Sequence, residues 1–183
     1  EKDLLWAQYP SDDEIDEVGV RGIYLGNFVN WDANPQTKLV MEKYDWRPAE
    51  KPFERTYRQM SNLDDMHENG MHDYLKFIKL GYGRGSDHAC KDIRAGHMSR
   101  ERGLEMVRKY DHVKSSDLKR WLTYVGMTEQ EFDSVCDTFR DPRVWWIQDG
   151  QWWKDTIWGE ATAYGPVHLS DAAQARYKEG KAR

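Results

Sequence analysis

A glycine-rich stretch with basic residues is the most chemically suggestive feature of the sequence. Residues 81–85 read Gly-Tyr-Gly-Arg-Gly and run directly into a predicted helix that begins near Ser86. The backbone N–H groups of such a loop can point at an anion together with the first turn of the helix. Arg84 would add a planar guanidinium suited to phosphate or carboxylate, and Lys79 a second positive charge. The spacing matches neither a Walker loop nor a dinucleotide-binding fingerprint, so a plain helix end and tight turn, with Arg84 in solvent, stays the alternative.

Two further arginines flank the next junction between predicted helices. Arg94 lies in the last turn of one helix, where the helix dipole favours a cation whatever its function. Arg100 follows Ser99 in the first turn of the next helix, where a positive charge is mildly disfavoured, which hints at a partner anion. The candidate anion-binding residues are therefore Lys79, Arg84, Arg94 and Arg100.

Histidine and cysteine patterns give no comparable signal. His67 and His72 are five residues apart, which does not place two ligands on one helix face, so we expect surface and capping histidines and no metal site. Cys90 and Cys136 each have apolar neighbours and no base nearby in sequence. We expect both to be small core residues, not nucleophiles.

Two tryptophan pairs lie near the C-terminal end of the sequence. Trp145-Trp146 and Trp152-Trp153 flank Asp149-Gly150, a dipeptide typical of a tight hairpin turn. Their rings could stack on a sugar or a base. Adjacent residues on a strand point to opposite faces, so a place in a core or a partner interface is the favoured interpretation.

The elements that must position these residues are mostly short helices. The apolar run 23–29 predicts a buried strand, and residues 45–61, with two prolines, predict an extended connector. Capping signals and apolar spacing predict helices over 12–18, 36–44, 63–80, 86–95, 99–110, 116–125 and 128–140, with stops at Gly81, Gly96 and Gly126. Ser11 would cap the first of these helices and Asn34 the second. We expect Leu39, Val40 and Tyr44 to pack in the second helix, and Tyr74, Leu75 and Ile78 to face inward in the third.

The fold class expected from these elements is mainly α with a few short strands (α+β). We expect three parts: a helical region over 1–141, a Trp-rich segment with a hairpin over 142–171, and a polar, frayed tail over 172–183.

Composition excludes several classes of protein. The chain has 183 residues with 32 acidic and 27 basic side chains, giving a net charge of -5, and no run approaches the roughly 20 apolar residues of a membrane span. Nine Trp argue against a disordered chain, and the net charge argues against a basic nucleic-acid binder. Two cysteines cannot build a disulfide framework, so we expect a cytoplasmic protein with no membrane or nucleic-acid partner. The sequence starts at Glu1 without an initiator Met or a targeting segment, and we expect it to be cut from a longer protein.

Several stretches together resemble the C-terminal half of the N-acetyl sugar amidotransferases of surface-polysaccharide synthesis, including lipopolysaccharide O-antigen. The similarity runs in order from about residue 9 to about residue 135. It is carried by Gly-Ile-Tyr-Leu-Gly-Asn-Phe-Val-Asn-Trp-Asp at 22–32, Phe-Ile-Lys-Leu-Gly-Tyr-Gly-Arg at 77–84, Asp-Ile-Arg-Ala-Gly at 92–96, and Ser-Arg-Glu at 99–101 leading to Lys-Tyr-Asp at 109–111.

This resemblance implies an enzyme of the ATP-pyrophosphatase (PP-loop) type. Such an enzyme uses ATP and Mg to convert the acetamido group of a nucleotide-linked N-acetyl sugar to an acetamidino group, through an adenylated intermediate and ammonia. The ammonia would come from a glutaminase and a barrel-type channel subunit. The family's Ser-Gly-Gly-x-Asp-Ser loop does not occur in this sequence. The chain would then be the helical C-terminal portion of a PP-loop α/β enzyme whose nucleotide-binding half is absent, inactive alone, with no cofactor of its own.

The resemblance carries over no established catalytic residue. It leaves Lys79, Arg84, Arg94 and Arg100 as candidate contacts to the substrate's phosphates, with Arg84 the preferred one.

Two other functions stay open from sequence. One is a non-catalytic interaction module that docks the glutaminase and channel partner or forms a homo-oligomer, with Trp145 and Trp152 as binding hot spots. The other is an RNA-facing helical module, since other PP-loop enzymes modify tRNA. The net charge of -5 argues against it.

Overall fold

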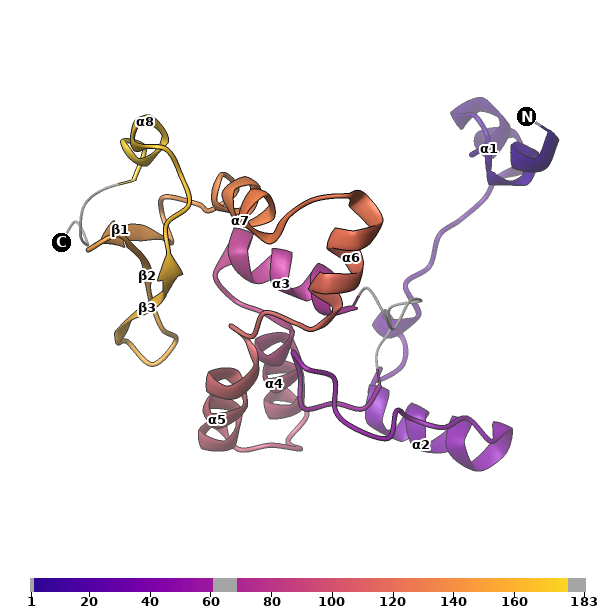
Figure 1. Ribbon diagram of the computed structural model, residues 1–183. Helices are drawn as coiled ribbons and strands as arrows, with labels where there is room; N and C mark the ends of the chain where they lie inside the picture. Colours follow the sequence, from indigo (N-terminus) through magenta and orange to yellow (C-terminus); the bar gives the residue numbers. More distant parts are fainter. Residues whose placement is uncertain (1, 61–68, 178–183) are drawn as a thin grey trace. The chain divides into compact units, whose positions relative to one another are not determined.

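The structure is a computed structural model that describes residues 2–60 and 69–177. The chain divides into two compact units, Glu1–Trp46 and Arg47–Arg183. The expected fold class is confirmed, because helices dominate the described residues and the strands form one small antiparallel sheet (Figure 1). No helix in the described part of the chain has the length and apolarity needed to cross a membrane.

The first unit is built from short helical segments. They are η1 (Lys2–Ala7), α1 (Asp12–Val18), η2 (Leu25–Asn27) and α2 (Ala33–Tyr44). Helix α1 begins as predicted: the Ser11 hydroxyl accepts from Glu14 N at 3.3 Å, and the Glu14 carboxylate accepts from Ser11 N at 2.8 Å. This reciprocal capping box satisfies two N–H groups that would otherwise lack partners at the helix start.

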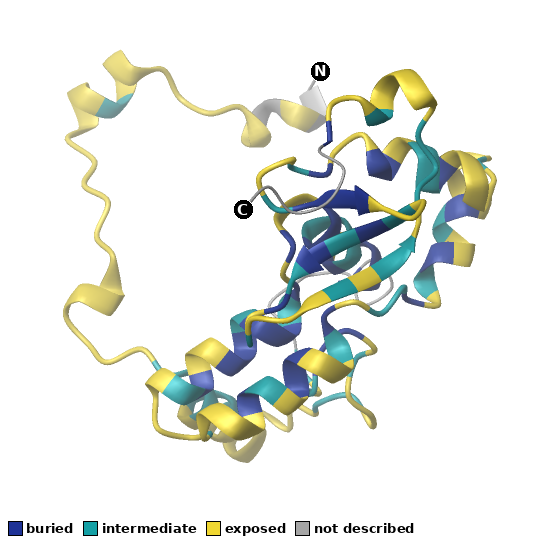
Figure 2. Cartoon of the chain, turned by 90° about the vertical axis from the view of Figure 1, so that its left-hand side faces the viewer, coloured by how far each residue is buried: buried dark blue, intermediate teal, exposed yellow. Residues whose placement is uncertain are grey.

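The buried strand predicted over residues 23–29 is wrong. The segment contains the single 3-10 turn η2, and Tyr24 and Phe28 are 83% and 74% exposed. A β-rich apolar run becomes a strand only where another strand supplies the ladder of hydrogen bonds, and the described residues of this unit contain none. Figure 2 shows almost the whole of this unit as exposed chain.

Helix α2 also differs from its prediction. It starts at Ala33, because the Asp32 carboxylate caps it by accepting from Asn34 N at 3.0 Å; Asn34 is therefore inside the helix and not its cap. Leu39 and Tyr44 were expected to pack, yet they are 46% and 75% exposed.

Helices of the second unit follow the local capping signals closely. They are α3 (Asn69–Leu80), α4 (Arg84–Arg94), α5 (Arg100–Tyr110), α6 (Asp117–Val125) and α7 (Glu129–Asp137). Ser99 caps α5, Thr128 forms a capping box with Glu131 at α7, and Gly126 ends α6 in the left-handed conformation, as expected. Helix α4 starts at Arg84, two residues before its prediction, and α7 ends three residues before Arg140. The predicted helical residues 63–68 lie outside the described part of the chain.

The sheet is a three-stranded antiparallel meander. Its strands are β1 (Trp146–Gln148), β2 (Gln151–Asp155) and β3 (Ala161–Pro166), in the order β1-β2-β3. The hairpin predicted at Asp149-Gly150 is confirmed, with positive φ of 50° and 68° at these two residues. The stretch after the sheet, expected to be a frayed tail, contains the short helix α8 (Asp171–Gln174) and the buried Tyr177.

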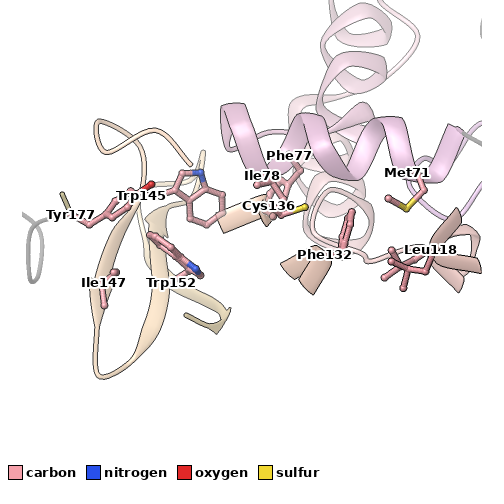
Figure 3. Packing of buried hydrophobic residues seen from close by; sticks show 11 residues of the cluster. Met71, Phe77, Ile78, Leu118, Phe132, Cys136, Trp145, Ile147, Trp152 and Tyr177 are labelled. Carbon is pink, nitrogen blue, oxygen red and sulfur yellow. The ribbon is translucent and has the colours of Figure 1, made fainter. Parts of the chain in front are cut away.

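One hydrophobic core joins the sheet to the helices of this unit. Met71, Phe77 and Ile78 of α3 pack with residues of α6 and α7. Ile147 and Trp152 of the sheet join this core together with Trp145, which directly precedes β1, and Tyr177 (Figure 3). Trp145 and Trp152 are fully buried. The core interpretation of these tryptophans is confirmed, and they cannot serve as exposed binding hot spots.

The two cysteines have different environments. Cys136 is buried as expected, and burial raises the pKa of its thiol to about 12, so it is inert as a nucleophile. The expectation that Cys90 is a core residue is wrong, because it is exposed. Helix α4 buries the face that carries His88, Ala89 and Asp92, which leaves Cys90 outward.

Candidate functional site

At the start of α4 the N–H groups of Gly83 and Ser86 point at an anion that belongs to the chain itself. Asp111 follows α5, and its carboxylate accepts from Gly83 N at 2.9 Å, Ser86 N at 2.9 Å and the Ser86 hydroxyl at 2.6 Å. Asp111 is 5% exposed. The N-terminus of α4 is therefore neutralised by an internal carboxylate, as the helix dipole favours.

Close backbone approach explains why glycines occupy this loop. A Cβ added at Gly85 would lie 2.7 Å from Asp111 Oδ1, and one at Gly83 would lie 3.0 Å from the Asp111 carbonyl oxygen. That same carbonyl accepts from the guanidinium of Arg55, which is 1% exposed and also donates to the Asp73 carbonyl at 3.2 Å. Burial lowers the Arg55 pKa to about 10. Asp111 thus ties the connector, the start of α4 and the end of α5 together.

The four basic residues singled out from sequence do not converge. Arg84 donates from Nε to Asp73 Oδ1 at 2.9 Å, and Nη2 lies 2.8 Å from the same oxygen. Lys79, Arg94 and Arg100 are exposed at the ends of three different helices. No observation tests whether any of the four binds a phosphate, so that assignment stays a prediction.

A cavity of about 370 Å³ lies between the helices and the sheet of the second unit. Helices α3 and α5 form one side, and β2, β3 and the turn between them form the other. Its walls carry five aromatic side chains, Tyr74, Phe77, Tyr82, Trp158 and Tyr164. Aromatic faces of this kind suit the ring of a sugar or a base.

Three aromatic rings at the wall of this cavity pack tightly against one another. Phe77, Trp145 and Tyr164 contact each other edge to face, with ring centroids 5.4–5.6 Å apart. Each ring is held by the other two, so the cavity wall is preorganised by the core itself.

Two buried cations and one exposed cation also line the cavity. Lys154 is 5% exposed and Arg140 is 4% exposed, while Arg108 reaches in from the exposed side of α5. Asp111 is the only acidic residue among the described residues that line the cavity, and its carboxylate oxygens are bound by the start of α4. The cavity therefore combines apolar walls with a surplus of positive charge, a setting that suits an anionic ligand with a ring.

At the rim of the cavity, a residue of α5 contacts the β2–β3 turn. The Arg108 guanidinium lies 4.4 Å from the centroid of the Trp158 ring. Trp158 is fixed in turn by a hydrogen bond from its Nε1 to the Glu160 carboxylate at 2.7 Å. This cation–π contact joins the helical side of the cavity to the sheet side.

Sequence reasoning missed these three cations, and one of them left a readable signal. Lys154 is two residues after Trp152 on β2, so both side chains share the buried face of the strand. A lysine on the inward face of a Trp-rich strand is unusual. Arg140 gave no such signal, since it was expected to end a helix.

A buried histidine near the start of α4 gives the protein a testable pH response. His88 is 8% exposed, its Nδ1 lies 2.6 Å from the Thr56 hydroxyl, and its ring packs edge-on against Tyr57. Burial, reinforced by the positive charges of Arg58, Arg84 and Lys91 and opposed by Asp87, lowers the His88 pKa from 6.5 to about 4.

We expect stability to fall as the pH drops from about 6.5 towards 4. In this window the unfolded chain takes up a proton on this residue and the folded chain does not, so the slope approaches about 1.4 kcal/mol per pH unit. Thermal unfolding of the wild type and of a His88→Gln variant between pH 7 and 4.5 measures it. Parallel curves for the two proteins would show that other groups cause the acid loss.

Within the described residues, no cluster of three His, Cys, Asp or Glu side chains is arranged to hold a metal ion. His67 lies outside that part of the chain. His72 contacts Asp73 at 3.1 Å.

A comparison with protein families identifies most of the chain. The family model described as "LPS biosynthesis protein WbpG-like, C-terminal domain" matches residues 40–157, which is more than half of the chain. The match includes Arg108, Arg140 and Lys154, while β3 lies beyond its end. No curated protein matches the chain. The chain therefore belongs to the WbpG-like family of lipopolysaccharide biosynthesis proteins.

Proposed function

We propose that this chain is the C-terminal part of an ATP-dependent amidotransferase of lipopolysaccharide biosynthesis. The enzyme would convert the acetamido group of a nucleotide-linked N-acetyl sugar to an acetamidino group, through an adenylated intermediate and ammonia. The family match supports the pathway, and the resemblance to N-acetyl sugar amidotransferases supports the reaction. Ammonia would be supplied by a glutaminase and a barrel-type channel subunit.

The residues of this chain do not fit an ATP site. No Ser-Gly-Gly-x-Asp-Ser loop occurs in the sequence. The glycine-rich loop before α4 has the N–H groups of Gly83 and Ser86 bound to the Asp111 carboxylate, so it does not offer these two donors to a triphosphate. We therefore assign ATP and Mg to a part of the enzyme outside this chain.

The role we propose for this chain is to bind the nucleotide sugar in the cavity between helices and sheet. The single observation that carries this proposal is the combination of aromatic walls with buried positive charge in one cavity. The rings offer faces for the sugar or the base, and the cations offer contacts for the phosphates.

Calorimetric titration of the full chain with UDP-N-acetylglucosamine, with ATP as the parallel control, tests this role. We expect saturable binding of the sugar nucleotide and none of ATP. A Tyr82→Ala variant should bind about fivefold more weakly, because it removes one rim aromatic face worth about 1 kcal/mol. Tyr82 is 41% exposed, so this change leaves the core intact.

Tyr124→Ala is the matched control, since Tyr124 is 88% exposed on α6 and does not line the cavity. Equal affinities for all three proteins would remove the cavity from substrate recognition. No binding by folded wild-type protein would leave partner docking as the better account of this chain.

A further inference from the structure

We propose that Lys154 and Arg140 together bind a phosphate group, and we call this pair the two-cation seat. The inference rests on the proposed function in one respect only: the phosphate would be that of the nucleotide sugar.

Lys154 is a buried cation whose charge is partly offset by the negative charges of Asp111 and Asp155. Its ammonium donates to the Asp155 carbonyl at 2.8 Å, and a carbonyl does not neutralise a positive charge. The ammonium also lies 5.3 Å from the Tyr164 ring centroid and 5.9 Å from that of Phe77. Burial lowers the pKa of Lys154, which reflects the cost of keeping this charge out of water. A methionine would fill the same space without that cost.

Arg140 keeps one buried donor for which the described residues supply no acceptor. Its Nε donates to Asp137 Oδ1 at 2.9 Å, which fixes one edge of the guanidinium. Its Nη1 is buried and has no hydrogen-bond partner within residues 2–60 and 69–177. The guanidinium lies 4.2 Å and 4.8 Å from the ring centroids of Trp145 and Trp152, so it cannot turn away to find one. Buried donors without partners are uncommon in native proteins and call for an explanation.

Two carboxylates near the seat, Asp137 and Asp111, already accept hydrogen bonds from other donors. The Asp137 carboxylate accepts from Arg140 Nε and, at 2.8 Å, from His168 N. The Asp111 carboxylate accepts from the start of α4. An external anion in the cavity that both cations line would give Arg140 Nη1 an acceptor and add negative charge beside Lys154.

Phosphate fits the seat better than carboxylate. A tetrahedral phosphate presents acceptors in several directions, so it can bond a planar guanidinium and a separate ammonium together. The cavity of about 370 Å³ also exceeds what a bare anion fills, and its remaining wall is aromatic. The expected ligand is thus a phosphate attached to a ring-bearing group.

Titration of the full chain with inorganic pyrophosphate at constant ionic strength tests the seat without sugar or nucleoside. Binding should change the fluorescence of Trp145 and Trp152, because Arg140 lies against both rings. We expect Lys154→Met to weaken pyrophosphate binding at least tenfold without lowering the unfolding temperature. Should that variant not fold, Lys154→Gln gives the same readout.

Lys119→Met is the matched control, since Lys119 is exposed on α6, is not one of the four candidate phosphate contacts and does not line this cavity. It should bind pyrophosphate as the wild type does. Equal weakening in both variants would overturn the seat in favour of general surface charge. Malonate binding as tightly as pyrophosphate would overturn the assignment to phosphate.

Competition with UDP-N-acetylglucosamine separates the two proposals. Displacement of pyrophosphate by the sugar nucleotide supports both. Pyrophosphate binding without such displacement keeps the seat and contradicts the proposed function. Sugar-nucleotide binding that is unchanged in Lys154→Met keeps the function and overturns the seat.

Discussion

An Asp111→Ala variant is expected to lose about 3–5 kcal/mol of stability, because three buried donors lose their acceptor together. These donors are Gly83 N, Ser86 N and the Ser86 hydroxyl. Each unsatisfied buried donor costs about 1–3 kcal/mol. Asp111 is 5% exposed, so water does not readily replace its carboxylate as the acceptor. Urea unfolding monitored by tryptophan fluorescence measures the loss.

Two companion variants show which property of Asp111 matters. Asp111→Asn keeps one acceptor oxygen and the size of the side chain, so it should lose less than the alanine variant. Asp87 lies in the first turn of α4, and its carboxylate pairs with Lys76 at a partly exposed site. An Asp87→Ala variant should therefore lose less than about 1 kcal/mol of stability. An Asp111→Ala protein as stable as Asp87→Ala would show that the start of α4 does not depend on this carboxylate.

Local hydrogen bonding explains which elements the sequence predicts well. Ser11, Ser99 and Thr128 each accept from an N–H three residues later, so the whole interaction lies within one short stretch of sequence. The Asp149-Gly150 turn is equally local, because its two left-handed residues are adjacent. Such signals need no knowledge of the rest of the fold.

Interactions distant in sequence explain what was missed. The anion at the glycine-rich loop comes from Asp111, 25 residues after Ser86. The contact of Arg84 with Asp73, 11 residues earlier on α3, is equally distant in sequence. Neither pairing leaves a pattern in the sequence, because each depends on how the helices pack.

The failed strand at residues 23–29 has a related cause. An apolar, β-branched run shows only that a segment suits a half-buried surface, and it does not show which strand would pair with it. The hairpin of the second unit was predicted correctly because a two-residue turn brings β1 and β2 together directly.

The candidate site could be predicted from the sequence only in part. Lys154 could be recognised from its spacing to Trp152, because alternate residues share one face of a strand. Arg140 enters the site only through the packing of its guanidinium on Trp145 and Trp152. A charged residue on the apolar face of a predicted strand is thus the one sequence signal that pointed to this cavity.

Trp152→Ala is expected to cost about 3–5 kcal/mol, the range for removing a large aromatic side chain from a core. Trp152 is fully buried on the central strand, and its ring packs edge-on against Tyr177 with centroids 4.7 Å apart. It also covers the Arg140 guanidinium, so its loss opens a void beside a buried charge. Thermal and urea unfolding give the change in stability.

The neighbouring Trp153→Ala is the matched control for this change. Trp153 points to the opposite face of β2 and is half-buried, with its Nε1 bonded to the Gln148 carbonyl at 3.2 Å. Its removal should cost about 1 kcal/mol, chiefly from that hydrogen bond and partial burial. A Trp152→Ala protein that kept wild-type stability but lost self-association would contradict the core role and restore the interaction-module interpretation. A large loss of stability in Trp152→Ala alone would instead mean that the Trp-rich segment holds the cavity wall in place, and that any partner must dock on another surface.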